Sequence, residues 1–280
     1  MAYPTVDGPY GLKPVNLIGG QVFAGSTRML PIQYQYNVDI FYGDFVVLSR
    51  GFATRASVAA GTGVNQVTGI FLGCSFTDPV TKQKRFSQFW PANTLAGDAV
   101  AYVVDDPDTI YKTAVCSATT VLASGARALV GTNLSMINNT GNVNTGNSRN
   151  AVLAPTATPV SSILPVRCVD VVEETAYTVT GVGSSAAAAI TLTGSGLTGP
   201  IPVGTSVAYL APNGQIIETS SFVITAAAAG ATSVTLNAAI AVPGGVVAIP
   251  AASTIIFTVY NEILVKVNLL VHGYYSSATA

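Results

Sequence analysis

Short apolar runs closed by glycine or by Asp-Pro constrain this chain more than any other feature. Three such runs, residues 40–51, 69–76 and 101–108, follow one another in the first half of the sequence. Runs of β-branched and aromatic residues that end in turn signals are typical of β-strands. In the first run Phe45 and Val47 alternate with Val46 and Leu48, so both faces of the strand are apolar. This pattern predicts an all-β fold, a barrel or a sandwich, whose strands are covered on both sides.

Charged residues are scarce. The 280 residues include 12 Lys and Arg and 13 Asp and Glu, or 9% of the chain, against about 25% in typical soluble domains. A lone monomer with so few charges has little to keep it dispersed, so we expect partners to cover much of its surface. The net charge of −1 offers no basic footprint, and nucleic acid is therefore not an expected partner.

The pattern of the three cysteines predicts free thiols rather than a zinc site or a redox pair. Cys74, Cys116 and Cys168 are widely spaced, lie in apolar runs and form no C-x-x-C pair, which argues against zinc and redox motifs. We expect buried free thiols in a protein assembled in a reducing cytoplasm. The first residues lack the basic and apolar regions of a secretory signal, and no run of 18 apolar residues is present to span a membrane as a helix. No membrane partner is expected.

The first 36 residues predict an extended N-terminal arm. Proline and glycine interrupt isolated apolar residues there, without a sustained period. A segment of this kind cannot build a core of its own and usually lies on another surface, here a neighbouring subunit or a shell of other subunits. A frayed terminus is the alternative, but the segment is too apolar for comfortable disorder. The candidate contact residues in it are Tyr10, Leu12, Leu17, Ile18, Val22 and Phe23.

The remaining chain divides by composition into a barrel domain (37–175 and 261–280) and an insertion (176–260). Between Thr175 and Asn261 the single charged side chain is Glu218, and residues 201–209 align weakly with residues 249–257. Two similar β units predict a small inserted β domain rich in Ala, Gly and Thr. The apolar run 263–271 is expected to rejoin the first domain, and its Leu269 and Val271 are further candidate contacts.

Three polar stretches carry alternatives. Lys82, Lys84 and Arg85 form a basic cluster that either contacts an acidic partner or is a solvated hairpin tip. Residues 105–108, Asp-Asp-Pro-Asp, predict a turn, because Asp before Pro accepts a backbone N–H; a calcium site is the minor alternative, since the EF-hand pattern is missing. The Asn- and Gly-rich loop 138–148 is expected to be exposed to solvent or to a neighbour.

No residue pattern in the chain predicts catalysis. His272 is the single histidine, no G-x-S-x-G elbow is present, and the ring is expected at a surface or interface. The string 181–186, Gly-Val-Gly-Ser-Ser-Ala, lacks the following helix and acidic residue of a dinucleotide-binding turn. We therefore predict no catalytic residue, no cofactor and no metal ligand, and a protein that is not an enzyme.

A resemblance appears in the order of the apolar blocks. Tyr42-Gly-Asp44, Gly69-Ile-Phe-x-Gly73, Phe89-Trp90 and Val104-Asp-Asp-Pro107 resemble a family of decoration (cement) proteins on tailed-phage capsids, over roughly residues 10–175 and again at 261–275. The resemblance implies a jelly-roll-like barrel without enzymatic activity on the outside of a virion, assembled in the host cytoplasm. Its implied partners are the major capsid protein and further copies of the chain, as a homotrimer or, alternatively, a dimer. Another virion part (a head fibre, knob or tail component) and a bacterial surface or adhesin module remain alternatives, although an adhesin should carry an export signal.

Overall fold

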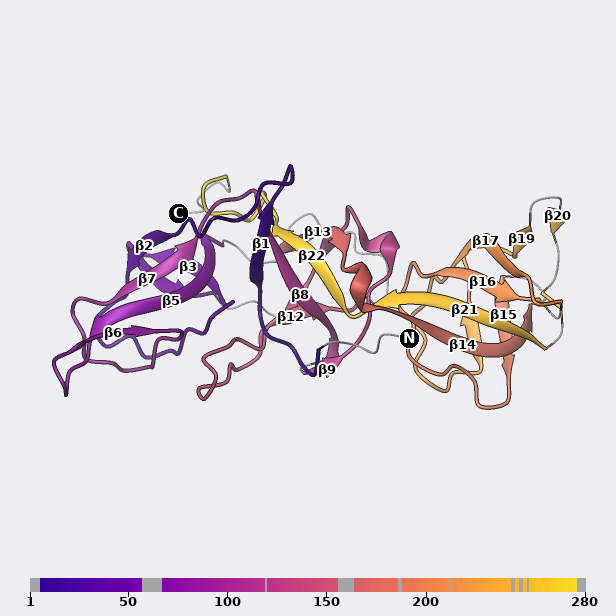
Figure 1. Cartoon of the computed structure of the whole chain (residues 1–280), viewed down its shortest axis with the longest axis horizontal. Helices are drawn as coiled ribbons and strands as arrows, with labels where there is room; N and C mark the ends of the chain where they lie inside the picture. Colours follow the sequence, from indigo (N-terminus) through magenta and orange to yellow (C-terminus); the bar gives the residue numbers. More distant parts are fainter. Residues whose placement is uncertain are drawn as a thin grey trace.

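Three large β-sheets, one of them accompanied by a separate two-stranded sheet, follow one another along the long axis of the molecule (Figure 1). The computed structural model describes residues 6–56, 67–118, 120–155, 164–185, 188–211, 213–242, 245–246, 249–250 and 252–275. The chain is essentially all-β with barrel-like sheets, which confirms the expected fold class. Within the described ranges the helical elements are two 3-10 turns, η1 (Arg127–Leu129) and η2 (Glu173–Thr175).

The first sheet contains the apolar runs that open the chain. Its strands lie in the order β2-β7-β5-β3-β4, with β6 paired to β5 and every pair antiparallel. Strands β5 and β7 approach so closely that a Cβ at Gly69 would lie 2.2 Å from the carbonyl oxygen of Val104, which explains the glycine. The strands are β2 (Arg28–Pro31), β3 (Phe45–Ser49), β4 (Phe52–Arg55), β5 (Gly69–Thr77), β6 (Lys84–Ser87) and β7 (Val100–Val104).

The middle sheet is organised around β8 (Thr109–Ala118). The first half of β8 pairs with β1 and β22, and its second half pairs with β9 and, in parallel, with β12. Beyond β22 lie β13 and the short β10, and beyond β12 lies β11. The other strands are β1 (Lys13–Leu17), β9 (Val121–Leu122), β10 (Asn133–Leu134), β11 (Met136–Ile137), β12 (Ala151–Leu153), β13 (Val166–Val171) and β22 (Glu262–Val267).

The third sheet is a six-stranded barrel at the far end of the molecule (Figure 1). Its order is β17-β16-β21-β14-β15-β18, and it closes where Val223 pairs with Leu236. The amide of Ile224 donates to the carbonyl oxygen of Thr235 at 3.0 Å across this closure. The strands are β14 (Ala176–Ser185), β15 (Ala189–Thr193), β16 (Ser206–Leu210), β17 (Ile216–Phe222), β18 (Ser233–Thr235) and β21 (Ser253–Tyr260), and a separate pair is formed by β19 (Ala241–Val242) and β20 (Gly245–Val246).

The cores follow this division. Phe45 and Ile70 of the first sheet share one cluster of buried residues with Tyr111 and Val265 of the middle sheet. Val46, next to Phe45, is buried in a second cluster on the opposite face of the first sheet. The alternating apolar run therefore produces a strand buried on both sides, as predicted. The barrel has a cluster of buried residues of its own, while Tyr260 at the end of β21 belongs to the cluster shared by the other two sheets.

The N-terminal segment differs from the expected extended arm. Within its described residues, β1 pairs with β8 and β2 pairs with β7, so the segment adds one strand to each of two sheets of its own chain. The expected barrel domain likewise divides over the first and middle sheets. The sequence did not predict these two short strands, because the apolar residues between the prolines and glycines show no sustained period.

Candidate interaction surfaces

An apolar groove of about 600 Å³ lies on the outer face of the middle sheet. Its walls include four large apolar side chains that folding leaves exposed: Ile18, Val130, Leu269 and Leu270 are 46%, 39%, 40% and 61% exposed. Clustered apolar exposure of this kind marks interaction sites more often than scattered single residues do. The groove therefore provides a candidate site for another molecule.

Two turns place the walls of the groove. After β1 the chain reverses through Gly19 and Gly20 at positive φ, and the amide of Ile18 donates to the carbonyl oxygen of Asp108 at 2.8 Å. On the other side, Asn268 accepts the amide of Leu270 at its side-chain oxygen, at 3.2 Å. The side-chain nitrogen of Asn268 donates to the carbonyl oxygen of Leu164 at 2.9 Å, which anchors this second turn to the sheet. The walls are thus held by turn geometry and by hydrogen bonds, including those of the Asn268 side chain, rather than by the apolar side chains themselves.

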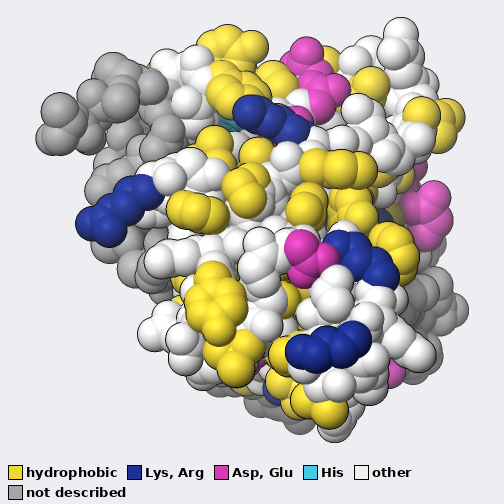
Figure 2. Space-filling model, turned by 90° about the vertical axis from the view of Figure 1, so that its left-hand side faces the viewer, with side chains coloured by type: hydrophobic (Ala, Val, Ile, Leu, Met, Phe, Trp, Pro, Cys, Tyr) yellow, Lys and Arg dark blue, Asp and Glu magenta, His cyan; other side chains and the backbone are white. Residues whose placement is uncertain are grey.

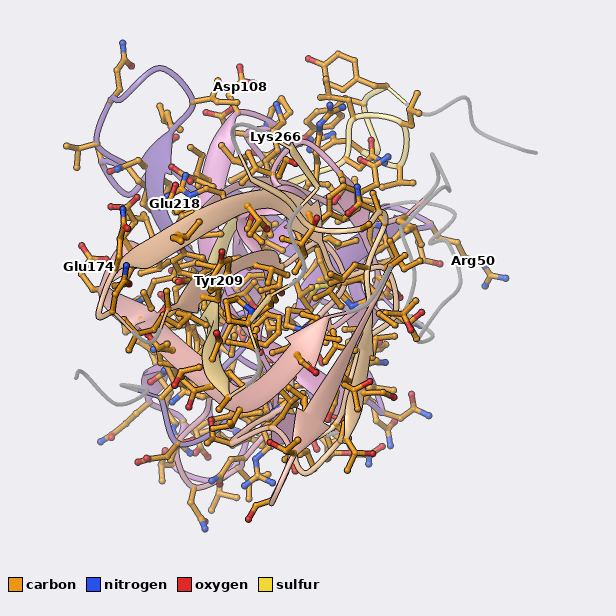
Figure 3. All side chains as sticks on the ribbon, turned by 90° about the vertical axis from the view of Figure 1, so that its right-hand side faces the viewer. Arg50, Asp108, Glu174, Tyr209, Glu218 and Lys266 are labelled. Carbon is orange, nitrogen blue, oxygen red and sulfur yellow. The ribbon has the colours of Figure 1, made fainter. Side chains whose placement is uncertain are left out.

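The floor of the groove is basic. Arg167 on β13 and Lys266 on β22 are directly opposite each other in the antiparallel ladder, and both line the groove. The nitrogen of Lys266 lies 3.5 Å from a carboxylate oxygen of Asp108, and Figure 3 shows both residues at the same end of the view. Arg167 is exposed, and no ion pair involves it among the residues that the structure describes.

Two of the predicted contact residues are buried within the chain itself. Leu12 is 0% exposed and belongs to the core between the first and middle sheets, and Val271 is 2% exposed. Both were selected for apolar character alone, which does not separate core positions from contact positions. Of the others, Ile18 and Leu269 come together at the groove, and Val22 is exposed nearby in the chain at 76%. Tyr10, Leu17 and Phe23 are half-buried, and the Tyr10 hydroxyl donates to the buried carboxylate of Glu262.

The basic cluster sits on the hairpin between β5 and β6, and its charges are largely used within the chain. Lys84 pairs with Asp98 at 2.9 Å, and Arg85 pairs with Asp78 at 3.0 Å. Asp78 also accepts the amides of Val80 and Thr81. Lys82 is exposed. The arrangement fits a solvated hairpin tip better than a docking site for an acidic partner, because two of the three positive charges are already compensated within the chain.

A buried carboxylate is the polar centre that the sequence did not reveal. Asp44 is 0% exposed, lies 2.9 Å from Arg55, and accepts hydrogen bonds from Ser148 and Asn150 at 2.6 and 3.0 Å. Burial raises the pKa of this carboxyl, and Arg55 and the hydrogen-bond donors oppose that shift. The tip of the Asn- and Gly-rich loop is exposed as expected, at Val143, Asn144 and Thr145, but the end of the loop is not. Its last residues are buried because Asp44 holds them against the first sheet.

The remaining polar candidates are structural. His272 was expected at a surface or an interface; within the single chain it is 1% exposed, and its Nδ1 accepts the amide of Tyr274 at 3.3 Å. Residues 105–108 form the predicted turn, in which Asp106 accepts the amide of Asp108 at 2.9 Å. Cys74, Cys116 and Cys168 are free and buried, as predicted.

Among the described residues no group of three or more His, Cys, Asp or Glu side chains could hold a metal ion. The described part of the chain contains no helix long and apolar enough to cross a membrane.

Comparison with known proteins found no matching family model, curated protein or solved structure.

Proposed function

We propose that this chain is a structural virion protein, a decoration protein that binds the outer surface of a tailed-phage capsid and cements neighbouring capsid subunits. The observation that carries the proposal is the apolar surface that folding leaves exposed. It includes the groove and, at the opposite end from the barrel, Met29 and Phe86, which are 68% and 76% exposed. Figure 2 shows hydrophobic side chains between basic and acidic ones over this end of the molecule.

The proposed role is mechanical rather than chemical. A protein that buries apolar surface across the joint between two capsid subunits raises the free energy needed to separate them, because binding stabilises the joined state. The resemblance to decoration proteins implies the capsid as partner and the homotrimer as the assembled form, with a dimer as the alternative. The barrel, with a core of its own, is then free to project from the attachment surface.

Binding to shells tests this proposal. Empty capsids of the parent virus that lack the chain should pellet the purified protein at saturable occupancy, and the decorated shells should resist disruption at a higher temperature than bare shells. Bovine serum albumin at the same concentration provides the control for trapping in the pellet. A protein that stays in the supernatant at tens of micromolar would contradict the proposed function.

A further inference from the structure

We propose that the groove on the middle sheet binds an extended segment of a different polypeptide, one that presents a carboxylate between apolar side chains. The inference deepens the proposed function, because it assigns the surface and the chemistry through which a shell subunit would be held. It rests on the groove itself, however, and it can fail or succeed without the virion.

The charge on the floor of the groove indicates the carboxylate. Arg167 and Lys266 are direct cross-strand neighbours, and like charges at such positions destabilise a sheet. Of the two, Lys266 alone has a compensating partner among the described residues, the weak 3.5 Å contact with Asp108. The residues that line the groove include these two cations and no carboxylate. A partner's carboxylate between the two would relieve the repulsion, and Arg can bind it through two parallel N–H bonds.

The walls indicate apolar neighbours on both sides of that carboxylate. Ile18 and Leu269 border the groove together with Val130 and Leu270, so a segment lying across Arg167 meets apolar surface before and after it. Apolar walls around a charged contact exclude water, and exclusion of water strengthens the ion pair. A partner segment in which apolar and acidic side chains alternate would match both the apolar walls and the two cations of the groove.

The occupant is a different chain rather than a second copy. Several exposed carboxylates of this protein are already in internal ion pairs: Asp98 with Lys84, Asp108 with Lys266, and Asp170 and Glu173 with Arg127. Asp7, Glu174 and Glu218 are exposed outside these pairs, but glycine or threonine follows each of them, so none lies between two apolar side chains. A foreign segment can present a carboxylate with apolar neighbours on both sides.

Peptide titration followed by NMR tests the proposal on the full chain. The probes are the capped tripeptide Leu-Asp-Leu and the same peptide with Asn in place of Asp, each added at millimolar concentration. We expect the Asp peptide to shift the backbone amides of Arg167, Lys266, Leu269 and Leu270 and to bind about tenfold more tightly than the Asn peptide. Equal affinity of the two peptides, or shifts that lie elsewhere, would overturn the proposal.

Two variants separate the groove from general charge effects. Arg167→Gln should abolish the preference for Asp over Asn, while Arg50→Gln, which removes an exposed charge that projects from another side of the molecule (Figure 3), should retain it. Because Arg167 faces a like charge, Arg167→Gln should also leave the midpoint of thermal unfolding unchanged or higher. A lower midpoint would show that Arg167 stabilises the sheet and would remove the argument from repulsion. A change of oligomeric state in Arg167→Gln alone would show that a second copy occupies the groove. If the protein does not bind capsids but prefers the Asp peptide as expected, the proposed virion function is rejected and the proposed binding site in the groove stands.

Discussion

At the scale of single residues, the stability of the first sheet depends on Asp44. Its carboxylate joins β3 to the loop that ends in Ser148 and Asn150 and lies beside Arg55 on β4. A buried ion pair is weak evidence of net stabilisation, but removal of one partner leaves the other charge buried and uncompensated. Substitution of Asp44 should therefore lower the free energy of unfolding more than loss of a single exposed negative charge would.

We predict that Asp44→Asn lowers the free energy of unfolding by about 3–5 kcal/mol. The matched control is Asp98→Asn, which breaks an exposed pair with Lys84 and should change stability by less than about 1 kcal/mol. Urea denaturation of both variants beside the wild type provides the comparison. Equal losses in the two variants would show that the network around Asp44 adds nothing to the exposed pair.

The three thiols give a second prediction at this scale. Burial raises the pKa of Cys74 and of Cys168 to about 12, and that of Cys116 to about 11. Because the thiolate is the reactive form, the native protein should react with a water-soluble aromatic disulfide at pH 8 only as fast as it unfolds. The reaction can be followed by absorbance, with urea-unfolded protein as the control. Rapid labelling of one thiol in the native state would contradict the burial of that cysteine.

At the scale of elements, the hairpin between β5 and β6 is closed by Asp78. The amides of Thr81 and Val80, followed by Arg85, lower the pKa of this carboxyl to about 2. Since the folded pKa lies below the unfolded value of about 3.9, the contribution of Asp78 is present above that value and is lost as the pH falls towards 2. We expect the backbone amides of Val80 and Thr81 to exchange with solvent faster, relative to unstructured amides, as the pH falls from 4 to 2. The variant Asp78→Asn should show no such change; the same pH dependence in the variant would refute the assignment to Asp78.

Sequence reasoning succeeded for elements whose side chains alternate and failed for elements defined by distant contacts. Phe45 and Val46 predict a strand buried on both faces because the period of two is visible locally. The short strands β1 and β2 are visible only through their partners β8 and β7, which lie about 70 or more residues further on. The groove was half predicted: Ile18 and Leu269 were selected as apolar, whereas Arg167 and Lys266 carry no local signal that they are neighbours. Leu12 and Val271 were misplaced because burial depends on tertiary packing.

At the scale of the whole molecule, the chain enters and leaves the barrel through two adjacent strands. β14 begins at Ala176 and β21 ends at Tyr260, and these two residues are paired in the ladder. The ends of the barrel segment therefore lie side by side, as in domains that tolerate insertion and deletion. The barrel's own cluster of buried residues also favours tolerance of its deletion.

We predict that residues 177–259 can be replaced by Asn-Gly, which forms a two-residue turn between paired strands. The shortened chain should remain soluble and unfold in one cooperative urea transition, because the core shared by the first and middle sheets is intact. Circular dichroism and tryptophan fluorescence report the transition, since the single tryptophan, Trp90, lies in the first sheet's core. An insoluble product, or two transitions that do not coincide, would show that the barrel supports the other sheets.

Cryo-electron microscopy of the virion that contains this chain tests whether the protein decorates the capsid through its groove. We predict three-fold density on the outer surface of the head, with the groove formed by Ile18, Arg167, Lys266 and Leu269 turned towards an acidic and apolar segment of a capsid subunit, and with the barrel pointing outwards. Density for this chain in the tail, inside the head, or on the head with the groove open to solvent would contradict it.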